Sequence, residues 1–398
     1  MIRIGLIRET KIPPDNRVAL IPAQCKWLQK NFASLKISVQ PSVYRCYSDK
    51  EYELAGVELK EDLGDCDFLF GIKEVHQDKL IPGKKYLFFS HTRKMQDYNR
   101  QLYRTILEKK ITLIDYECME HEDGQRILGF GFFAGIVGAH NGMMAYGNRS
   151  KKYTLPRVYL QPNFKQLIHG YFGIRLPNIK VVITGSGRVA HGLLEVMNLL
   201  GIIELEPDEF LSRNFAYPVF TQLKGPFLYR HKKNGSYNRE AFHQAPDSYN
   251  CLFKPYSENA DILLNGIYWE PRMPRLFEWD QLLSPEFRIQ TIADITDDKN
   301  GSVPCNLGDG TMEEPVYGVN KITRARTAPY LEGSLDVMAV GNLPNELPRD
   351  ASRYFGEQLI KYVLEDLFKE GSPVIQRATM VLEGKITPLF GYMKSYGI

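Results

Sequence analysis

Three short apolar runs in the first 120 residues each end in a charged or proton-transferring side chain. The run 68–72 is followed by Lys73 and Glu74, the run 86–90 by His91, and the run 111–114 by Asp115, Tyr116 and Glu117. Short apolar runs separated by helical or turn segments are typical of buried parallel strands. Ligands of open α/β sheets bind at the carboxyl ends of such strands. The sequence therefore predicts a sheet that brings a lysine, a histidine and a glutamate to one edge, as an acid–base active site requires.

The length and charge of the chain limit its organisation and its partners. At 398 residues the chain is too long for one ordinary core, so we expect two domains. A composition of 43% hydrophobic and 24% charged residues, with a net charge of +3, is globular and gives no reason to expect nucleic acid or an acidic partner. We expect small-molecule substrates and a monomer or small homo-oligomer.

Cysteine spacing and hydropathy bear on metals and on location. The six cysteines are scattered without a CxxC pair, so we expect no metal site and no disulfide framework. The first residues carry no secretory signal, and the longest apolar stretch, 127–139, is glycine-rich and too short to cross a bilayer. A cytoplasmic location without membrane attachment is the simplest expectation.

Helical segments are predicted where apolar residues recur at helical spacing. Residues 95–110 have this spacing and would form the crossover between two parallel strands. The small, apolar, glycine-rich segment 135–146 is interpreted as a helix that packs closely at a domain junction, with a flexible hinge as the alternative. Residues 354–369 form a third helical pattern, in a tail that we expect to return to the first domain.

These segments predict a discontinuous α/β organisation. The substrate-binding, catalytic domain would comprise residues 1–135 plus 337–398, and the dinucleotide-binding domain residues 136–336. Within the latter, residues 207–260 are polar, tyrosine-rich and irregular, which favours a solvated excursion. No internal repeat or low-complexity tract interrupts this organisation.

A glycine-rich turn predicts a phosphate-binding loop. Gly185-Ser186-Gly187-Arg188-Val189-Ala190 joins a buried strand, 180–184, to a helical run. The first glycine permits the tight turn, the second lets the backbone approach a pyrophosphate, and the alanine allows close packing of helix on strand. The N-terminus of the helix supplies unpaired N–H donors and a partial positive charge. This arrangement favours a bound dinucleotide over a structural glycine turn.

The choice between NAD and NADP is left open by the sequence. Glu204 ends a short apolar segment after the helix, at a distance where an acidic residue accepts hydrogen bonds from the adenosine ribose and repels the extra phosphate of NADP. Glu206 is an alternative to Glu204, whereas Arg230 or Lys232 could hold a 2′-phosphate. We expect NAD, with NADP possible.

Several longer segments resemble one enzyme family. They are 88–96, 113–117, 265–270, 293–298 and 342–344. Together they resemble lysine-forming saccharopine dehydrogenases and the lysine–ketoglutarate reductase portion of the bifunctional aminoadipic semialdehyde synthases. More distantly, 17–22 and 72–74 resemble alanine dehydrogenase and the nucleotide-binding part of transhydrogenase. The resemblance extends over nearly the whole chain.

The resemblance implies a fold and a reaction. The fold would be two Rossmann-like domains with parallel sheets flanking an interdomain cleft, with the C-terminal tail completing the first domain. The reaction would interconvert saccharopine with lysine and 2-oxoglutarate through an imine, by hydride transfer with a nicotinamide cofactor. Lys73 and His91 would be the two acid–base catalysts, which requires the pKa of the lysine to be depressed toward neutrality.

The resemblance also implies binding residues. Carboxylates near the two bases would be Glu74 and Glu117, the cations for substrate carboxylates Arg17, Lys94 and Arg126, and the apolar wall of the pocket Phe130. Further residues would contact the cofactor: Asn265, Gly266, Asp298, Asn342 and Leu343. The register of the acidic position is uncertain, because Asp294 and Asp297 lie beside Asp298.

Two other functions fit part of this pattern. The first is an oxidative deaminase similar to alanine dehydrogenase, whose carboxylate-binding residues would look alike. The second is an NAD-binding partner protein without turnover, against which the intact set of Lys73, His91 and Asp298 argues.

Overall fold

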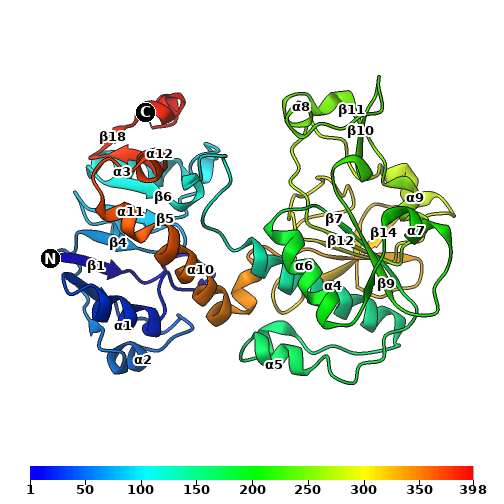
Figure 1. The fold of residues 1–398 in the computed structure, drawn as a ribbon, viewed down its shortest axis with the longest axis horizontal. Coiled ribbons are helices and arrows are strands. Elements are labelled where there is room, and N and C mark those ends of the chain that lie inside the picture. The colour runs from blue at the N-terminus through cyan, green and yellow to red at the C-terminus, as the bar shows by residue number, and fades with distance from the viewer. Residues whose placement is uncertain (398) are drawn as a thin grey trace. The chain divides into compact units, whose positions relative to one another are not determined.

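The computed structural model describes residues 1–397 and folds the chain as two compact units (Figure 1). Unit 1 comprises Met1–Phe130 and the chain from Pro348 onward, and unit 2 comprises Gly131–Leu347. The boundaries expected from the sequence, after residues 135 and 336, lie inside a helix and a strand that both belong whole to unit 2. The first boundary therefore falls at the start of the helix, at Gly131, and the second falls after Leu347, nine residues beyond the end of the strand.

Unit 1 is built on an eight-stranded sheet in the order β18-β17-β6-β5-β4-β1-β2-β3. Its strands are β1 (Ile2–Leu6), β2 (Leu35–Val39), β3 (Glu58–Leu59), β4 (Phe68–Phe70), β5 (Lys85–Phe88), β6 (Thr112–Asp115), β17 (Thr379–Leu382) and β18 (Lys385–Ile386). The first six strands are parallel, in the order 3-2-1-4-5-6 of a doubly wound sheet. The C-terminal tail adds β17 antiparallel to β6. The predicted apolar runs are therefore neighbouring parallel strands.

The helices of unit 1 include the predicted crossover between β5 and β6. They are α1 (Pro22–Asn31), α2 (Asp49–Leu54), α3 (Arg100–Glu108), α10 (Pro348–Tyr362), α11 (Leu364–Phe368), α12 (Pro373–Ala378) and α13 (Lys394–Gly397). The crossover begins later than residue 95 because Met95 has a φ of 52°, outside the helical region. The predicted helix 354–369 is interrupted at Val363, which has non-helical angles.

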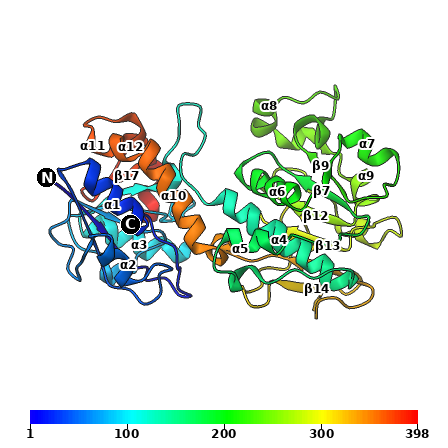
Figure 2. The same cartoon turned by 60° about the horizontal axis from the view of Figure 1, so that its bottom comes forward.

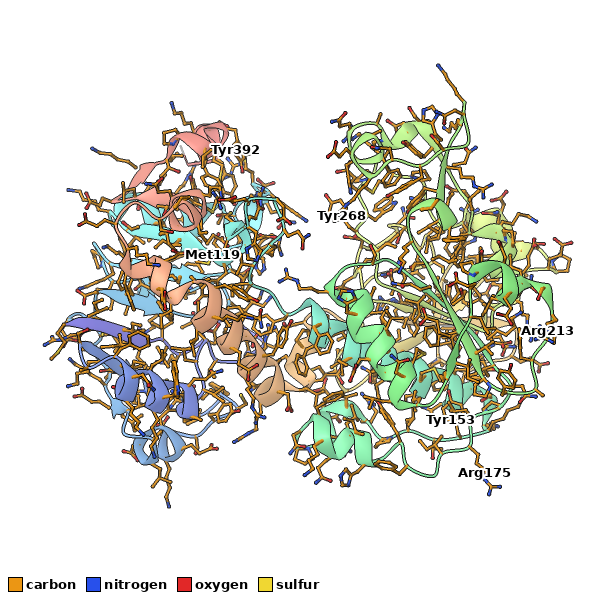
Figure 3. The ribbon with its side chains drawn as sticks, in the orientation of Figure 1. Met119, Tyr153, Arg175, Arg213, Tyr268 and Tyr392 are labelled. Atoms are coloured by element: carbon orange, nitrogen blue, oxygen red, sulfur yellow. The ribbon has the colours of Figure 1, made fainter. Side chains whose placement is uncertain are left out.

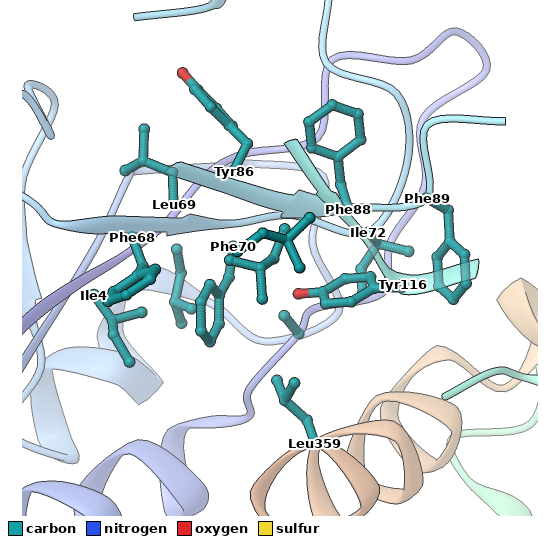
Figure 4. Packing of buried hydrophobic residues seen from close by; sticks show 14 of the residues in the cluster. Ile4, Phe68, Leu69, Phe70, Ile72, Tyr86, Phe88, Phe89, Tyr116 and Leu359 are labelled. Carbon is teal, nitrogen blue, oxygen red and sulfur yellow. The ribbon is translucent and has the colours of Figure 1, made fainter. Parts of the chain in front are cut away.

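Large buried side chains fill the core of unit 1 (Figure 4). Phe70, Tyr86 and Phe88 come from the central strands and are each at most 1% exposed. At the carboxyl ends of the strands, Phe89 and Tyr116 meet edge to face with ring centroids 5.3 Å apart. Burial of aromatic rings at this edge holds the loops that follow the strands in fixed positions.

Unit 2 contains a second eight-stranded sheet, in the order β15-β14-β16-β13-β12-β7-β9-β8. Its strands are β7 (Lys180–Thr184), β8 (Ile203–Glu204), β9 (Val219–Leu223), β12 (Ile262–Asn265), β13 (Thr291–Asp294), β14 (Val316–Asn320), β15 (Arg326–Thr327) and β16 (Ser334–Met338). All pairs are parallel except those made by β14. Two mostly parallel sheets therefore confirm the predicted α/β fold class.

The segment 207–260 is more ordered than the sequence suggested. It supplies β9, whose five residues are all buried and which lies next to β7 in the sheet. It also contains a separate hairpin of β10 (Tyr229–His231) and β11 (Tyr249–Cys251), and the helices α7 (Pro207–Ser212), α8 (Arg239–Gln244) and α9 (Lys254–Ser257). The interpretation as a solvated excursion was wrong for β9, because five consecutive buried residues were masked by their polar surroundings.

Two glycine-bearing helices cross closely in unit 2. They are α4 (Gly131–Ser150) and α6 (Arg188–Leu199), which lie side by side in both views (Figures 1 and 2), and α5 (Phe164–His169) is the remaining helix of the unit. A Cβ atom added to Gly192 would lie only 2.9 Å from the Cα of Gly135 and would overlap the carbonyl oxygen of Phe132. The predicted helix over 135–146 is present, and its glycines allow the two backbones to touch.

Two whole-chain features remain. None of the helices in residues 1–397 combines the length and the apolar composition needed to span a bilayer. Each of the six cysteines is a free thiol in the structure.

Candidate active site

The predicted catalytic lysine lies at the switch point of the first sheet, where the neighbouring strands β1 and β4 lead in opposite directions along the sheet order. Glu9, three residues after β1, accepts hydrogen bonds from the backbone N–H groups of Ile72 (2.7 Å) and Lys73 (2.8 Å) through its two carboxylate oxygens. This contact fixes the backbone of Lys73 at the carboxyl edge of the sheet. The sequence analysis missed Glu9, because it lies outside the apolar runs.

The surroundings of Lys73 favour its neutral amine. Burial, followed by the repulsive charges of Arg17 and Lys11, lowers the pKa of Lys73 from 10.5 to about 8, against the opposing pull of Asp15 and Glu74. An ammonium group loses hydration when it is enclosed, which disfavours the charged form. Lys73 therefore has the depressed pKa that an amine needs in order to act as a base near neutral pH.

Arg17 is engaged within the chain itself. Its Nε donates to Asp15 Oδ1 at 2.9 Å and its Nη2 donates to Asp15 Oδ2 at 2.6 Å, and both residues are only 2% exposed. The guanidinium also lies 4.0 Å from the centroid of the Phe130 ring, which in turn stacks on Phe355 at 4.7 Å. The predicted carboxylate-binding arginine thus points one side of its fork at an internal carboxylate.

Glu74 connects the two predicted catalytic residues: it follows Lys73 in the chain and contacts the side chain of His91. His91 Nδ1 lies 2.6 Å from Glu74 Oε1, and Lys11 Nζ lies 3.1 Å from Glu74 Oε2. Burial alone would raise the pKa of Glu74, but the hydrogen bond and charge of His91, together with Lys11, lower it to about 2. Glu74 is therefore ionised at neutral pH and accepts the Nδ1 proton, which leaves Nε2 of His91 as the reactive nitrogen.

The backbone of His91 is also held in place. Its φ of 51° is left-handed, its carbonyl accepts a hydrogen bond from Asn99 Nδ2 at 3.2 Å, and its ring is nearly parallel to that of Phe89. Left-handed geometry at a non-glycine residue costs free energy and persists where the surroundings impose it. The imidazole is thus constrained on both sides.

Glu117 and Arg126 form an ion pair at 2.9 Å. Glu117 lies on the short helix η3 (Tyr116–Cys118), which Asp115 caps by accepting the Glu117 N–H at 2.7 Å. Lys94, in contrast, is exposed and makes no ion pair with the described residues. The structure thus pairs two of the predicted substrate-binding residues with each other and leaves Lys94 apart.

The glycine turn of unit 2 has the geometry that a pyrophosphate requires. Gly185 has a φ of 106°, and a Cβ there would lie 2.6 Å from the carbonyl oxygen of Gly266, at the switch point between β7 and β12. Gly187 caps α6, and a Cβ there would meet no atom within 4 Å, so the space above the helix N-terminus is open. Ser186 is exposed beside it. These residues fit a dinucleotide phosphate group.

Two residues expected near the cofactor have side chains that are used inside the protein. Asn265, which is fully buried, accepts a hydrogen bond from Thr184 Oγ1 at 2.6 Å and donates to Asp294 Oδ1 at 2.9 Å and to Ser302 Oγ at 2.8 Å. The amide of Asn265 therefore ties the strand ends together, and its contact with the cofactor stays a prediction. Leu343 is only 3% exposed and packs toward Gly138 of α4, so it belongs to the core.

The three neighbouring aspartates differ in their surroundings. Asp294 is fully buried and accepts hydrogen bonds from Asn265, Thr296 and Asn306, which excludes it from contact with a ligand. Asp298 is exposed, and so is Asn342, which has a φ of 67°. Burial, followed by the hydrogen bond and charge of Asp309, raises the pKa of Asp297 to about 8. Within residues 1–397, no group of three or more His, Cys, Asp or Glu side chains could hold a metal ion.

Glu204, the residue predicted to contact the adenosine ribose, lies on a strand that is not next to β7. Its strand, β8, lies at the outer edge of the sheet and pairs only with β9. Glu204 is level with Phe220 of β9, which is in turn level with Val181 near the start of β7. The strand beside β7 is β9, and Lys224 follows its carboxyl end, with Nζ donating to Gln222 Oε1 at 2.9 Å. The ribose role of Glu204 stays a prediction, and the sheet order argues against it because β9 lies between β8 and β7.

The comparisons with known proteins agree with this architecture. The family model for the N-terminal domain of alanine dehydrogenase/PNT matches residues 5–137. The mitochondrial alpha-aminoadipic semialdehyde synthase of Rattus norvegicus is 31% identical over 98% of this chain and 47% of its own length, so the chain spans about half of that relative. The saccharopine dehydrogenase (NAD(+), L-lysine-forming) of Yarrowia lipolytica is 24% identical over 96% of this chain and 97% of its own.

A solved structure extends the likeness to the whole fold. An L-alanine dehydrogenase superposes with a TM-score of 0.67 at 16% sequence identity, covering 99% of both chains. Residues 5–137 thus match the alanine dehydrogenase/PNT N-terminal domain, and the chain as a whole is similar in sequence to enzymes named saccharopine dehydrogenase (NAD(+), L-lysine-forming).

Proposed function

We propose that the protein is an NAD-dependent oxidoreductase that interconverts saccharopine with lysine and 2-oxoglutarate. The observation that carries the proposal is the presence of Lys73, Glu74 and His91 after the carboxyl ends of the neighbouring strands β4 and β5, where Lys73 has a pKa of about 8 and Glu74 binds the imidazole of His91. The name of the Yarrowia lipolytica relative, saccharopine dehydrogenase (NAD(+), L-lysine-forming), supports both the choice of NAD as cofactor and the choice of saccharopine and lysine as substrates.

The chemistry begins with the side-chain amine of lysine, which must be neutral to attack the keto carbon of 2-oxoglutarate. Lys73 accepts the proton that this amine gives up, since its own amine is free in a sizeable fraction of molecules near neutral pH. A C–N bond forms, and the carbonyl oxygen takes up a proton to give a carbinolamine. Loss of that oxygen as water leaves the imine.

His91 manages the protons at the carbinolamine. Its Nε2 donates a proton to the departing hydroxyl, and in the reverse direction it accepts a proton from the attacking water. Glu74, ionised beside Nδ1, holds the ring orientation and stabilises the imidazolium. When bound, the nicotinamide supplies the hydride that reduces the imine carbon to the secondary amine of saccharopine.

The substrate carboxylates require cations. Lys94 is exposed and Arg126 is half-exposed, so both can receive a carboxylate from solution. Arg126 would exchange Glu117 for the substrate, while Arg17 would keep Asp15 and contribute its field and its remaining guanidinium face. Phe130, fixed between Arg17 and Phe355, would form an apolar wall.

The two units divide these tasks. Unit 1 would bind and deprotonate the amino acid, and unit 2 would bind the dinucleotide through Gly185, Ser186, Gly187 and the N–H groups of Arg188 and Val189. Gly266, Asp298 and Asn342 lie at the ends of strands or turns of unit 2 and remain candidates for contact with the cofactor.

Initial rates with defined substrates test the proposal. The protein is assayed with lysine, 2-oxoglutarate and NADH, and in parallel with ammonia, pyruvate and NADH. We expect turnover with the first set. Turnover only with the second would make the protein an alanine-dehydrogenase-like deaminase, which the family-model match leaves as the second candidate. NADH binding without turnover on a broad panel of amino and keto acids would indicate a partner protein.

A further inference from the structure

A hollow of about 440 Å³ opens at the amino edge of the sheet in unit 2. It is lined by the chain before β13, the start of β16, the residue after β14 and the ends of α4 and α9. The charged residues of its lining are Arg149, Glu258, Glu286, Arg288 and Lys321. The parallel strands run from this edge to the edge that carries the glycine turn. The hollow is therefore separate from the dinucleotide position, and its volume is within the range of small-molecule sites.

Three cationic side chains converge on this hollow. Arg149 is satisfied inside the protein, with Nη1 on Asp336 Oδ2 at 2.8 Å and Nη2 on the carbonyl of Ser334 at 2.5 Å. Arg288 uses only its Nε, which donates to Asp261 Oδ1 at 3.1 Å, so the two terminal nitrogens of its fork make no hydrogen bond with the described residues. A guanidinium with two free parallel N–H groups is matched to a carboxylate or phosphate.

Lys321 is the third cation, and no carboxylate within residues 1–397 pairs with it. It is half-buried, and the nearest aromatic neighbour of its Nζ is the ring of Phe287, 5.4 Å away. Burial, followed by the charge of Arg149, lowers the pKa of Lys321. A partly desolvated ammonium without a counterion is an unfavourable arrangement that a bound anion relieves.

The acidic residues around the hollow are committed to another lysine. Glu258 forms an ion pair with Lys254, and Glu286 Oε2 lies 3.7 Å from the same ammonium. These two carboxylates therefore do not neutralise Arg288 or Lys321. Asp336 pairs with Arg149 and Asp261 with Arg288, so the charges around the hollow balance as a whole. The capacity to bind an anion therefore depends on Lys321, which has no carboxylate partner among the described residues, and on the terminal nitrogens of Arg288.

We propose that this hollow is an oxyanion-binding site for a small dianion, gripped by the free fork of Arg288 and the ammonium of Lys321 within the field of Arg149. The ligand class is a carboxylate- or phosphate-bearing small molecule. The site is independent of the proposed reaction, since it lies at the opposite edge of the sheet from the glycine turn.

Calorimetric titration of the whole 398-residue chain tests this site, with inorganic phosphate and succinate as separate probes at constant ionic strength. We expect Lys321→Gln and Arg288→Gln each to weaken binding of the better probe by about tenfold or more, as loss of a charge-assisted hydrogen bond implies. Lys321→Arg, which keeps the charge, should bind as the original protein does. Lys165→Gln, at an exposed position of α5 in the same unit, should leave the affinity unchanged.

Each titration is repeated with saturating NAD⁺, because the glycine turn also attracts phosphate. Binding that persists with NAD⁺ and is lost with Lys321→Gln supports the site, and the tighter probe identifies the oxyanion source. Three outcomes overturn it: no binding of either probe below about 10 mM, equal affinities in Lys321→Gln and the original protein, or complete displacement by NAD⁺. If the protein does not bind NAD⁺ at all, the proposed reaction fails but the comparison of the variants still decides this site. Thermal unfolding of each variant separates lost binding from lost folding.

Discussion

Removal of the charge of Arg17 should raise the pKa of Lys73 and suppress its action as a base at neutral pH. Lys73 has a pKa of about 8 in place of 10.5, and burial and Arg17 are the two largest causes. At pH 7 this difference increases the fraction of free amine from about 0.03% to about 10%, or roughly 300-fold. The low pKa of Lys73 is thus a large part of its capacity to accept a proton.

In Arg17→Met the repulsive cation is lost, and Asp15, which attracts the ammonium, is left uncompensated. Both changes act in the same direction, so the pKa of Lys73 rises toward 10.5. The free-amine fraction at pH 7, and with it kcat, should fall by about tenfold to 300-fold, and the loss should shrink as the pH is raised past 9. The ascending limb of the pH–rate profile moves to higher pH.

The pKa can be measured without turnover. Trace acetylation at a series of pH values, followed by mass spectrometry of the Lys73 peptide, reports the free-amine fraction, and exposed Lys94 in the same sample is the matched control. The double variant Asp15→Asn/Arg17→Met removes both opposing charges, so burial alone should hold the pKa of Lys73 near 8. This double variant also avoids the cost, about 3–5 kcal/mol, of leaving one member of a buried ion pair alone. An unchanged labelling midpoint for Lys73 in folded Arg17→Met would refute the electrostatic argument.

Three further predictions concern unit 2. Gly192→Ala should destabilise the protein by about 1–3 kcal/mol in urea unfolding, because its Cβ would press α6 away from α4; a gain in stability, as for an exposed helical glycine, would contradict the close crossing. Glu204→Gln should leave the dissociation constants of NAD and NADP unchanged. Lys224→Glu should shift the preference toward NAD, because it places a carboxylate at the end of the strand beside β7. Fluorescence titration with both dinucleotides measures these constants, and a strong effect of Glu204→Gln would support its ribose role. Asn265→Leu should cost about 1–3 kcal/mol by leaving buried partners unsatisfied, as measured by thermal unfolding; an unchanged melting temperature would mean that the hydrogen bonds at the strand ends contribute little.

The first sheet illustrates what a sequence can predict about a site. Lys73 and His91 follow short apolar runs that form strands buried except for Lys85 at the start of β5, so the local pattern was enough to assign both residues to one edge. Parallel strands share their carboxyl edge by geometry, which makes such a prediction independent of distant detail. The pair of Glu74 with His91 follows from the same rule.

Contacts between segments far apart in the chain could not be predicted in this way. Glu9 reaches the backbone of Lys73 across 64 positions of sequence, and no periodic pattern marks it. Asn265 matched a motif, but only the folded strand ends reveal that its amide is already used by Thr184 and Asp294. The side chains that remain available to a ligand are known only after the internal hydrogen bonds have been assigned.

Sheet order is the other limit. Glu204 stands at the expected distance after the glycine turn, yet β9 is inserted between β7 and β8. The five residues of β9 lie in a segment whose exposed loops give it a polar average, although each of them is buried. Side-chain exposure also cannot be inferred from residue type. The ring of Tyr268, two residues after Gly266, is 70% exposed, whereas Met119, directly after η3, is fully buried (Figure 3).

The central claim is that Lys73 and His91 carry protons during the reaction and do not merely support the fold. The most direct measurement compares kcat for lysine and 2-oxoglutarate with the dissociation constant of NADH in Lys73→Met and His91→Gln. We predict that kcat falls by about 10²-fold or more in each variant while the affinity for NADH changes by less than about twofold. Equal losses of kcat and NADH affinity in both variants would contradict the claim.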